Sequence, residues 1–318
     1  MAVRLAMIVT SDTEDIFLNQ AAEAQLAAKL PEGAAALFLW SNARTVVIGR
    51  NQDARAECDI ALLESEGGRL ARRLSGGGAV YHDSCDLNFT FLAWERDFDK
   101  DANTRAVIRA LARLGVEAEA TGRNDITVRG AKISGSAYHS AGGVKLHHGT
   151  LIIGSHPGAV ARYLTPSPRK LAERGVASVS ARVTSLGDLA GADKRAAADA
   201  LRAEFTAMYP EARVALKVFP RDADAEDLRE RAKFFAGDEW RKGKSGGERL
   251  RLSAEVFGRR AEIAVGEDGG IRIYSDGLDA GGIAEVERLL AEGAEATTDA
   301  GREARRIREL IEKESDEN

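Results

Sequence analysis

The sequence contains only two cysteines, Cys58 and Cys85, and no C-x-x-C pair. Two cysteines cannot build a disulfide framework, and without a paired-cysteine motif a structural zinc site is not expected. Such sparing use of cysteine is typical of proteins in a reducing compartment, where thiols stay free. We therefore expect a cytoplasmic protein.

Long apolar runs and an excess of positive charge are also absent. No stretch approaches the roughly 18 consecutive apolar residues of a membrane-spanning helix, and the apolar start at residues 1–10 is too short for a signal peptide. The formal net charge is −5, and no local basic patch carries interleaved aromatic residues. We expect partners other than membranes or nucleic acid.

The length and composition predict two globular domains. A chain of 318 residues with 44% hydrophobic and 30% charged residues can bury a large core. Residues 240–247 are rich in glycine and lysine and read as a linker, which divides the chain into domains 1–245 and 246–318. In the second domain, apolar residues alternate three times over residues 250–273, which predicts a three-stranded antiparallel meander followed by two helices.

The first domain begins with a strand and a helix. Residues 3–9 read as a strand, and Ser11-Asp12-Thr13 as the cap of a helix that runs to about residue 29. Asn19 and Glu23 are four residues apart on that helix and so share a face. They can point into a site, but we interpret them as solvent-facing or structural.

Two further strand patterns follow. Residues 37–40 and 45–48 predict a hairpin through the four residues between them. Residues 87–91, Leu-Asn-Phe-Thr-Phe, alternate apolar and polar with period two and predict a half-buried strand.

The stretch that organises the chain is residues 72–83, Arg-Arg-Leu-Ser-Gly-Gly-Gly-Ala-Val-Tyr-His-Asp. Glycines bring backbone N–H groups close to a ligand, and clustered N–H donors suit phosphate. The two arginines add permanently charged forks that match phosphate or carboxylate oxygens. A surface hairpin turn with solvated arginines is the alternative interpretation.

A second polar cluster covers residues 122–151 and predicts three short strands. Lys132 lies between small residues on one of them, where its ammonium can meet a phosphate or carboxylate; an ordinary exposed lysine is the alternative. His147 and His148 point to opposite faces of a strand, so only one can enter a site and a metal pair is not expected. Neither cluster is a P-loop or a dinucleotide-binding fingerprint, yet together they suit one site for a nucleotide and an anionic co-substrate.

These runs resemble those of the two-domain lipoate–protein ligases. The resemblance rests on residues 45–52, 72–83, 87–91, 122–126, 132–137, 147–151 and 178–186, in order, and covers roughly residues 1–245. It implies an α+β fold of the biotin/lipoyl protein ligase type with a small C-terminal α+β accessory domain. It also implies a two-step reaction, in which ATP and lipoate give lipoyl-adenylate and a lysine of a lipoyl-domain acceptor protein then takes the lipoyl group. The acceptor can be a dehydrogenase acyltransferase subunit, a glycine-cleavage carrier or a specialised lipoate-binding carrier.

The resemblance also assigns roles by position. Lys132 would be catalytic, and Asp125 would sit by a Mg2+ ion. The residues implied in binding ATP and the adenylate are Arg73, Gly76, Gly77, Gly78, Ala79, Val80, Tyr81, Asn124, Asp125, Lys132, Ser134 and Gly135. Those implied in the lipoyl pocket are Arg50, His82, Cys85 and His148.

One departure from the family pattern leaves alternatives open. Where the family usually has Asp-x-Gly-Asn, this chain has Asp83-Ser84-Cys85-Asp86, which adds a side chain and a charge beside the expected acyl pocket. An acyltransferase with Cys85 as nucleophile is one alternative, although Asp83 and Asp86 oppose a thiolate there. A biotin ligase and a non-catalytic nucleotide- or lipoate-binding regulator are the others, and the intact Arg73, triple-glycine and Lys132 set argues against the regulator.

Overall fold

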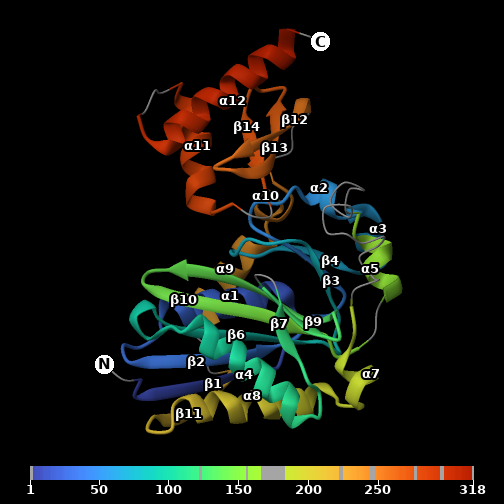
Figure 1. The fold of residues 1–318 in the computed structure, drawn as a ribbon, viewed down its shortest axis with the longest axis vertical. Coiled ribbons are helices and arrows are strands. Elements are labelled where there is room, and N and C mark those ends of the chain that lie inside the picture. Colours follow the sequence, from blue (N-terminus) through green and yellow to red (C-terminus); the bar gives the residue numbers. More distant parts are fainter. Residues whose placement is uncertain are drawn as a thin grey trace.

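The structure is a computed structural model. It describes residues 3–121, 124–154, 157–165, 183–221, 225–243, 248–275, 278–293 and 297–316. The architecture is mixed α+β, with a large body built on one long sheet and a smaller C-terminal body (Figure 1). The predicted fold class is confirmed.

The long sheet has eight strands in the order β11-β1-β2-β6-β10-β9-β8-β7. Its strands are β1 (Leu5–Ser11), β2 (Ala34–Trp40), β6 (Leu87–Trp94), β7 (Glu119–Thr121), β8 (Asp125–Val128), β9 (Ala131–Ala141), β10 (Val144–Leu151) and β11 (Arg213–Phe219). β1 pairs in parallel with both β11 and β2, and the pairs from β2 to β7 are antiparallel.

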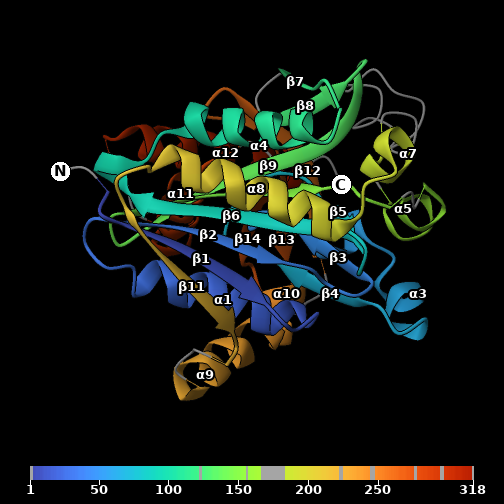
Figure 2. The ribbon, with the colours of Figure 1, turned by 90° about the horizontal axis from the view of Figure 1, so that it is seen from below.

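Helices cover both faces of this sheet (Figure 2). One face carries α1 (Ile16–Ala28) and α9 (Ala225–Ala236), and the other carries α4 (Lys100–Arg113) and α8 (Lys194–Met208). Asp15 caps α1, so the helix begins later than the cap predicted at residues 11–13. Two short elements complete this layer, η1 (Glu95–Asp97) and α7 (Leu186–Ala190).

A second sheet lies beside the first, with the order β4-β3-β5. Its strands are β3 (Thr45–Ile48), β4 (Arg69–Arg72) and β5 (Val80–His82), and its flanking helices are α2 (Ala54–Glu57), α3 (Ile60–Ser65) and α5 (Pro157–Tyr163). The hairpin predicted for residues 37–40 and 45–48 is therefore wrong, because β2 and β3 belong to different sheets. Buried side chains turn the chain between them: Ser41 donates to Asp86 O and Asn42 accepts from Asn19.

The half-buried strand predicted at residues 87–91 is also wrong in its burial. β6 lies between β2 and β10 in the middle of the long sheet, and seven of its eight residues are buried. Its polar members, Asn88 and Thr90, are 1% and 0% exposed. The alternation therefore marks buried hydrogen bonds rather than a solvent face.

The C-terminal body has its own core. Strands β12 (Glu248–Val256), β13 (Arg259–Gly266) and β14 (Ile271–Tyr274) form the predicted antiparallel meander, which packs against α11 (Ala280–Glu292) and α12 (Asp299–Asp316). The prediction of the meander and its two helices is confirmed, whereas the domain boundary near residue 245 stays a prediction.

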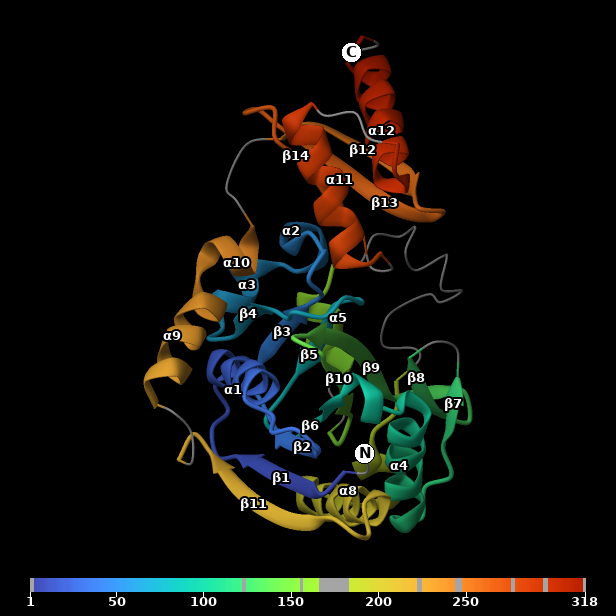
Figure 3. The same cartoon turned by 90° about the vertical axis from the view of Figure 1, so that its left-hand side faces the viewer.

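The two bodies meet at the segment that follows β3 (Figure 3). Asn51 O accepts from Ser275 N at 2.8 Å, its side chain donates to Leu278 O, and Arg251 pairs with Asp53. The short helix α10 (Asp238–Lys242) follows α9 on this side.

None of the helices in the described part of the chain is both long and apolar enough to cross a membrane.

Candidate functional site

The floor of the candidate site is the face of β9 and β10 that looks toward α1. Thr150 lies opposite Gly135, and His148 lies opposite Ala137, so these residues share that face. A Cβ built on Gly135 would come within 2.6 Å of Lys132 Nζ, which shows that the lysine lies across this glycine. The lack of a side chain at Gly135 therefore makes room for the ammonium of Lys132 on the same face as His148.

In this position Lys132 is paired with Asp125. Lys132 Nζ lies 2.8 Å from Asp125 Oδ1, and the two side chains are 32% and 45% exposed. An ion pair this open to solvent contributes about 0–1 kcal/mol to stability. A phosphate or carboxylate can therefore replace the carboxylate of Asp125 at little cost.

The roof of the site is the glycine loop between β4 and β5, and Arg73 holds its shape. The guanidinium of Arg73 donates to Gly76 O and Gly78 O, both at 2.8 Å, and to Val47 O at 3.1 Å. Gly77 has φ +94°, which favours glycine. The Arg73 fork therefore shapes the loop in this structure.

Arg72 does not contribute a phosphate-binding fork, which corrects the interpretation of the two arginines as a pair. It is buried, and its guanidinium donates to the backbone carbonyls of Gly49, Arg50, Gln52, Trp240 and Arg241. Burial lowers the pKa of Arg72 to about 10. It ties the second sheet to α10 rather than facing the site.

A buried chain of polar groups joins the roof to the floor. Ser75 Oγ lies 2.6 Å from His148 Nε2, and His148 Nδ1 lies 2.9 Å from Glu23 Oε1. Thr90 donates to the same carboxylate oxygen at 2.7 Å. Burial opposes ionisation of Glu23, but its interactions with His148 and Thr90 prevail and lower its pKa. Ser75 is 1% exposed, which favours a role in fixing the loop over one as a nucleophile.

The same contacts decide between the two interpretations of Asn19 and Glu23: the solvent-facing one is wrong, and the structural one agrees with their buried hydrogen bonds. Asn19 is 0% and Glu23 is 6% exposed, and both are hydrogen-bonded inside the protein. Their spacing of four residues places them on one face of α1. This spacing was visible in the sequence, but it was not taken to mark a buried face. Ser75 lay in the glycine motif, and Thr150 in the second cluster, but neither was predicted as a site residue.

His82 anchors the other end of the loop. Asn42 Nδ2 lies 3.0 Å from His82 Nδ1, so this nitrogen accepts and the proton belongs on Nε2, which faces Thr150 Oγ1 at 2.8 Å. Thr150 in turn donates to Asn88 Oδ1. Burial lowers the pKa of His82 to about 3, so the imidazole is a neutral linker between β5 and β10.

His147 and His148 lie on opposite faces of β10, as predicted. His147 packs among Phe89, Phe91 and Tyr138 with its Nε2 2.9 Å from Ser136 Oγ. Its Nδ1 has no hydrogen-bond partner among the residues that the structure describes, and burial lowers the pKa of His147 to about 3. His147 is thus a neutral core residue outside the site.

These buried imidazoles predict a loss of stability in mild acid. Below pH 6.5 the unfolded chain protonates His147 while the folded protein does not until about pH 3, so stability falls as the pH drops through this window. At pH 5 the loss from His147 is about 2 kcal/mol. Between pH 7 and pH 5, we expect the free energy of unfolding of His147→Phe to fall by about 2 kcal/mol less than that of wild type. Urea titrations at the two pH values measure this difference. An unchanged pH dependence would show that His147 already titrates normally.

The other predicted site residues are placed unevenly. Ser134 lies opposite Ile126 and Leu151, so its buried hydroxyl points to the other face of the sheet and only its backbone can reach the site. The Tyr81 ring stacks on the Tyr163 ring with 5.7 Å between the centroids, and the Tyr81 hydroxyl donates to the Asp83 carboxylate. Asn124 O accepts from Ser136 N.

Arg50 belongs to the junction of the two bodies. Its guanidinium lies over the Trp240 ring, 5.7 Å from the centroid, while its backbone N–H donates to Ser75 O. The backbone of Arg50 thus lies next to the glycine loop.

The loop at residues 83–86, where the chain departs from the family pattern, is stabilised by an acidic side chain. Asp86 is 2% exposed and its carboxylate accepts from the backbone N–H groups of Asp83, Ile153 and Gly154. Burial, together with Asp86 and Asp83, raises the pKa of the Cys85 thiol. The added charge therefore organises the loop, and it disfavours a reactive thiolate.

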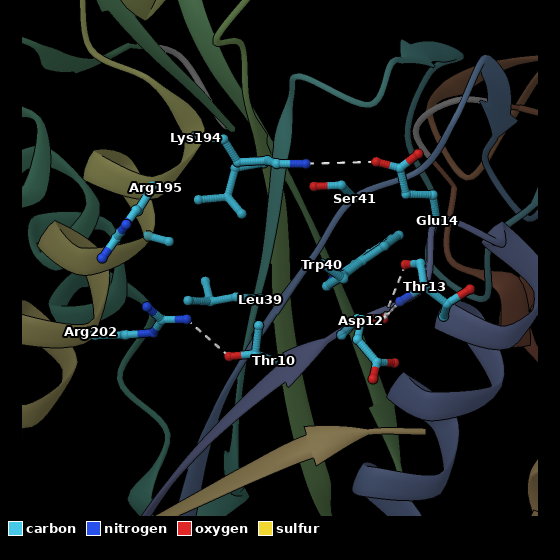
Figure 4. A pocket seen from close by; sticks show the side chains of 13 residues that line it. Thr10, Asp12, Thr13, Glu14, Leu39, Trp40, Ser41, Lys194, Arg195 and Arg202 are labelled. Atoms are coloured by element: carbon cyan, nitrogen blue, oxygen red, sulfur yellow. Dashed lines mark hydrogen bonds and ion pairs between the residues drawn. The ribbon is translucent and has the colours of Figure 1, made fainter. Parts of the chain in front are cut away.

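A pocket of about 330 Å³ lies elsewhere, at the carboxyl ends of β1 and β2 (Figure 4). Two of its cations have partners in the lining: Lys194 faces Glu14 at 3.8 Å, and Arg202 donates to the Thr10 hydroxyl at 3.0 Å. Neither Lys132 nor the glycine loop lines it. The pocket is thus separate from the candidate site.

Comparison with known proteins shows which family and which folds the chain is similar to. The family model described as the lipoyl protein ligase A/B catalytic domain matches residues 15–206. A P. falciparum protein, LipL1, solved in complex with lipoate, is 26% identical with a TM-score of 0.77, covering 90% of this chain and 89% of that one. A bipartite lipoate protein ligase from Thermoplasma acidophilum, studied with its E2 lipoyl domain, is 25% identical with a TM-score of 0.64, covering 79% and 100%. A lipoate-protein ligase A bound with ATP is 25% identical with a TM-score of 0.61, covering 76% and 99%.

Proposed function

The chain belongs to the family of the lipoyl protein ligase A/B catalytic domain and is a ligase, and we propose that it is an ATP-dependent lipoate–protein ligase. In the first step the lipoate carboxylate attacks the α-phosphorus of ATP, the bond to pyrophosphate breaks, and lipoyl-adenylate forms. In the second step a lysine amine of a lipoyl domain attacks the acyl carbon and AMP leaves. The relatives of this chain support the three substrates of the proposal. One was solved with lipoate, one with ATP, and one was studied with its E2 lipoyl domain.

One observation carries the proposal: a cation and a glycine-rich loop meet on one face of the sheet. Lys132 Nζ lies over Gly135, which is opposite Thr150, and Thr150 contacts His82 at the end of the loop. The loop is joined to the same face by Ser75 and His148. An anionic substrate entering between them meets both a fixed charge and bare backbone.

This arrangement suits adenylation. Negative charge grows at the α-phosphate as the carboxylate attacks, so a fixed ammonium and N–H donors stabilise the transition state more than the ground state. No protein nucleophile is needed, because holding carboxylate and phosphorus together supplies much of the rate. We assign Lys132 to the α-phosphate and acyl oxygens, and the loop at residues 76–81 to the nucleotide.

A magnesium ion fits the carboxylate of Asp125. Mg2+ is commonly held by one or two carboxylates together with substrate phosphates, and it would neutralise charge on the leaving pyrophosphate. Within the described ranges no group of three metal-binding side chains occurs, which agrees with an ion held mainly by the nucleotide. With the Lys132 ammonium against the phosphate, Asp125 would be available to hold such an ion.

The acyltransferase alternative predicts a different result at Cys85. Because its pKa is raised by burial and by Asp86, we expect Cys85→Ser to retain ligase activity within about twofold. Lipoate transfer measured in parallel for the variant and wild type checks this. Loss of activity in Cys85→Ser with an unchanged melting temperature would favour covalent acyl transfer through the thiol.

The second half-reaction tests the proposal as a whole. A purified acceptor lipoyl domain is incubated with the protein, lipoate, Mg2+ and ATP, and its intact mass is measured. We expect one added lipoyl group that requires ATP and is lost when the acceptor lysine is changed to arginine. A regulator would leave the acceptor unmodified, and a thioester-dependent transferase would require an acyl-carrier donor in place of ATP.

A further inference from the structure

The pocket of about 330 Å³ lies where β1 and β2 end side by side in parallel. The space beyond the carboxyl ends of parallel strands is a common place for ligands in sheets that helices cover. Here α8 lines the pocket on one side, and the segment 12–14, which leads into α1, lines it on the other. Its volume lies at the lower end of the range for small-molecule sites.

The floor of this pocket is apolar. Leu39 from β2, Leu87 from β6 and Ala198 from α8 line it, and all three side chains are buried in the protein apart from the surface they present here. A ligand with an apolar body would shield this floor from water, which an inorganic ion does not do. The floor therefore favours an organic ligand.

The two walls of the pocket carry opposite charges (Figure 4). Lys194, Arg195 and Arg202 line it from α8, whereas Asp12 and Glu14 line it from the segment before α1. Lys194 Nζ lies 3.8 Å from Glu14 Oε1, so the charges of the two walls come close together. A ligand with one charge of each sign matches both walls, whereas a simple anion would face the two acids.

Within the described ranges, one charge on each wall has no partner. Neither the Arg195 guanidinium nor the Asp12 carboxylate forms an ion pair or a side-chain hydrogen bond with another residue that the structure describes, and both residues are exposed. Arg202, in contrast, donates to Thr10 and pairs with Asp199. Arg195 and Asp12 can therefore receive a carboxylate and an ammonium group without breaking an existing contact.

We propose that this pocket binds a small zwitterion with an apolar body, namely an amino acid with an aliphatic side chain. The carboxylate of the ligand pairs with Arg195, its ammonium group pairs with Asp12, and its side chain covers Leu39 and Leu87. The proposal does not depend on the ligase reaction, because neither Lys132 nor the glycine loop lines the pocket.

L-leucine is the probe, and two compounds with a similar branched body are the comparison. Isocaproate carries only the carboxylate, and isoamylamine carries only the ammonium group. Binding to the full chain is followed by two-dimensional NMR of the backbone amides. We expect leucine to bind with a millimolar Kd and each singly charged compound to bind at least about tenfold more weakly. No saturable binding of leucine, or equal binding of either singly charged compound, would overturn the proposal.

Variants locate the ligand. Arg195→Gln and Asp12→Asn should each weaken leucine binding at least about tenfold, since each removes one charged contact. Arg229→Gln, an exposed arginine of α9 on the opposite face of the sheet, is the matched control and should bind leucine as wild type does. Lys132→Ala should also bind leucine normally. Binding that Arg195→Gln and Asp12→Asn leave unchanged would overturn the proposal, and a loss in Lys132→Ala would place the ligand in the candidate site instead.

Discussion

Replacing Lys132 with alanine is expected to lower the rate of lipoyl-adenylate formation by about 10²–10³-fold, the usual effect of removing one group that stabilises developing charge. The ammonium lies over Gly135, where it can follow charge onto the phosphate. The fold should survive, because the ion pair with Asp125 is open to solvent and contributes about 1 kcal/mol at most. Single-turnover formation of the adenylate, with thermal unfolding in parallel, measures both effects.

Lys145 provides a matched control. It is also a strand lysine paired with a carboxylate, with Nζ 2.6 Å from Glu95 Oε1 and 37% of its side chain exposed. Lys145→Ala removes a comparable ion pair but should leave adenylation unchanged. If both variants, or neither, lost adenylation, Lys132 would not have the role assigned to it.

Replacing Gly49 with alanine should disable the site from outside the glycine motif. A Cβ on Gly49 would lie 2.1 Å from Gly77 O and 3.1 Å from Gly76 C, and these are backbone atoms that cannot rotate away. The glycine loop or the end of β3 must then move. We expect kcat/KM for ATP to fall by about 100-fold, since small displacements of positioning groups have effects of this size. The free energy of unfolding should fall by about 1–3 kcal/mol, as for overpacked cores.

Gly76→Ala is the control that distinguishes steric crowding by the new Cβ from the loss of a glycine as such. A Cβ on Gly76 would have no neighbour within 4 Å, so Gly76→Ala should keep wild-type stability. Chemical unfolding of the two variants gives the comparison. Equal stability of Gly49→Ala and wild type, with unchanged KM for ATP, would show that the approach of Gly49 to the loop carries no function.

The sequence was informative where chemistry is local. The glycine motif, the strand lysine and the opposed His147 and His148 could all be predicted, because glycine, charge and strand alternation act over a few residues. The C-terminal meander could be predicted for the same reason.

Features set by distant contacts could not be predicted. β2 and β3 resemble a hairpin until the buried contacts of Ser41 and Asn42 send them into different sheets. Alternating polar residues in β6 would mark a solvent-facing side only if one face of the sheet were uncovered. Helices α1 and α8, which are distant in the sequence, cover the two faces. Arg72 and Arg73 are neighbours in sequence, yet Arg72 is buried among carbonyls of residues 49–52 and α10, whereas Arg73 donates to carbonyls of the glycine loop.

The account depends on ATP being activated on the face shared by Lys132 and the glycine loop. Isotope exchange between pyrophosphate and ATP, measured without any acceptor, reports that step alone. We predict exchange that requires lipoate and Mg2+ and disappears in Lys132→Ala. ATP binding without lipoate-dependent exchange would contradict the account.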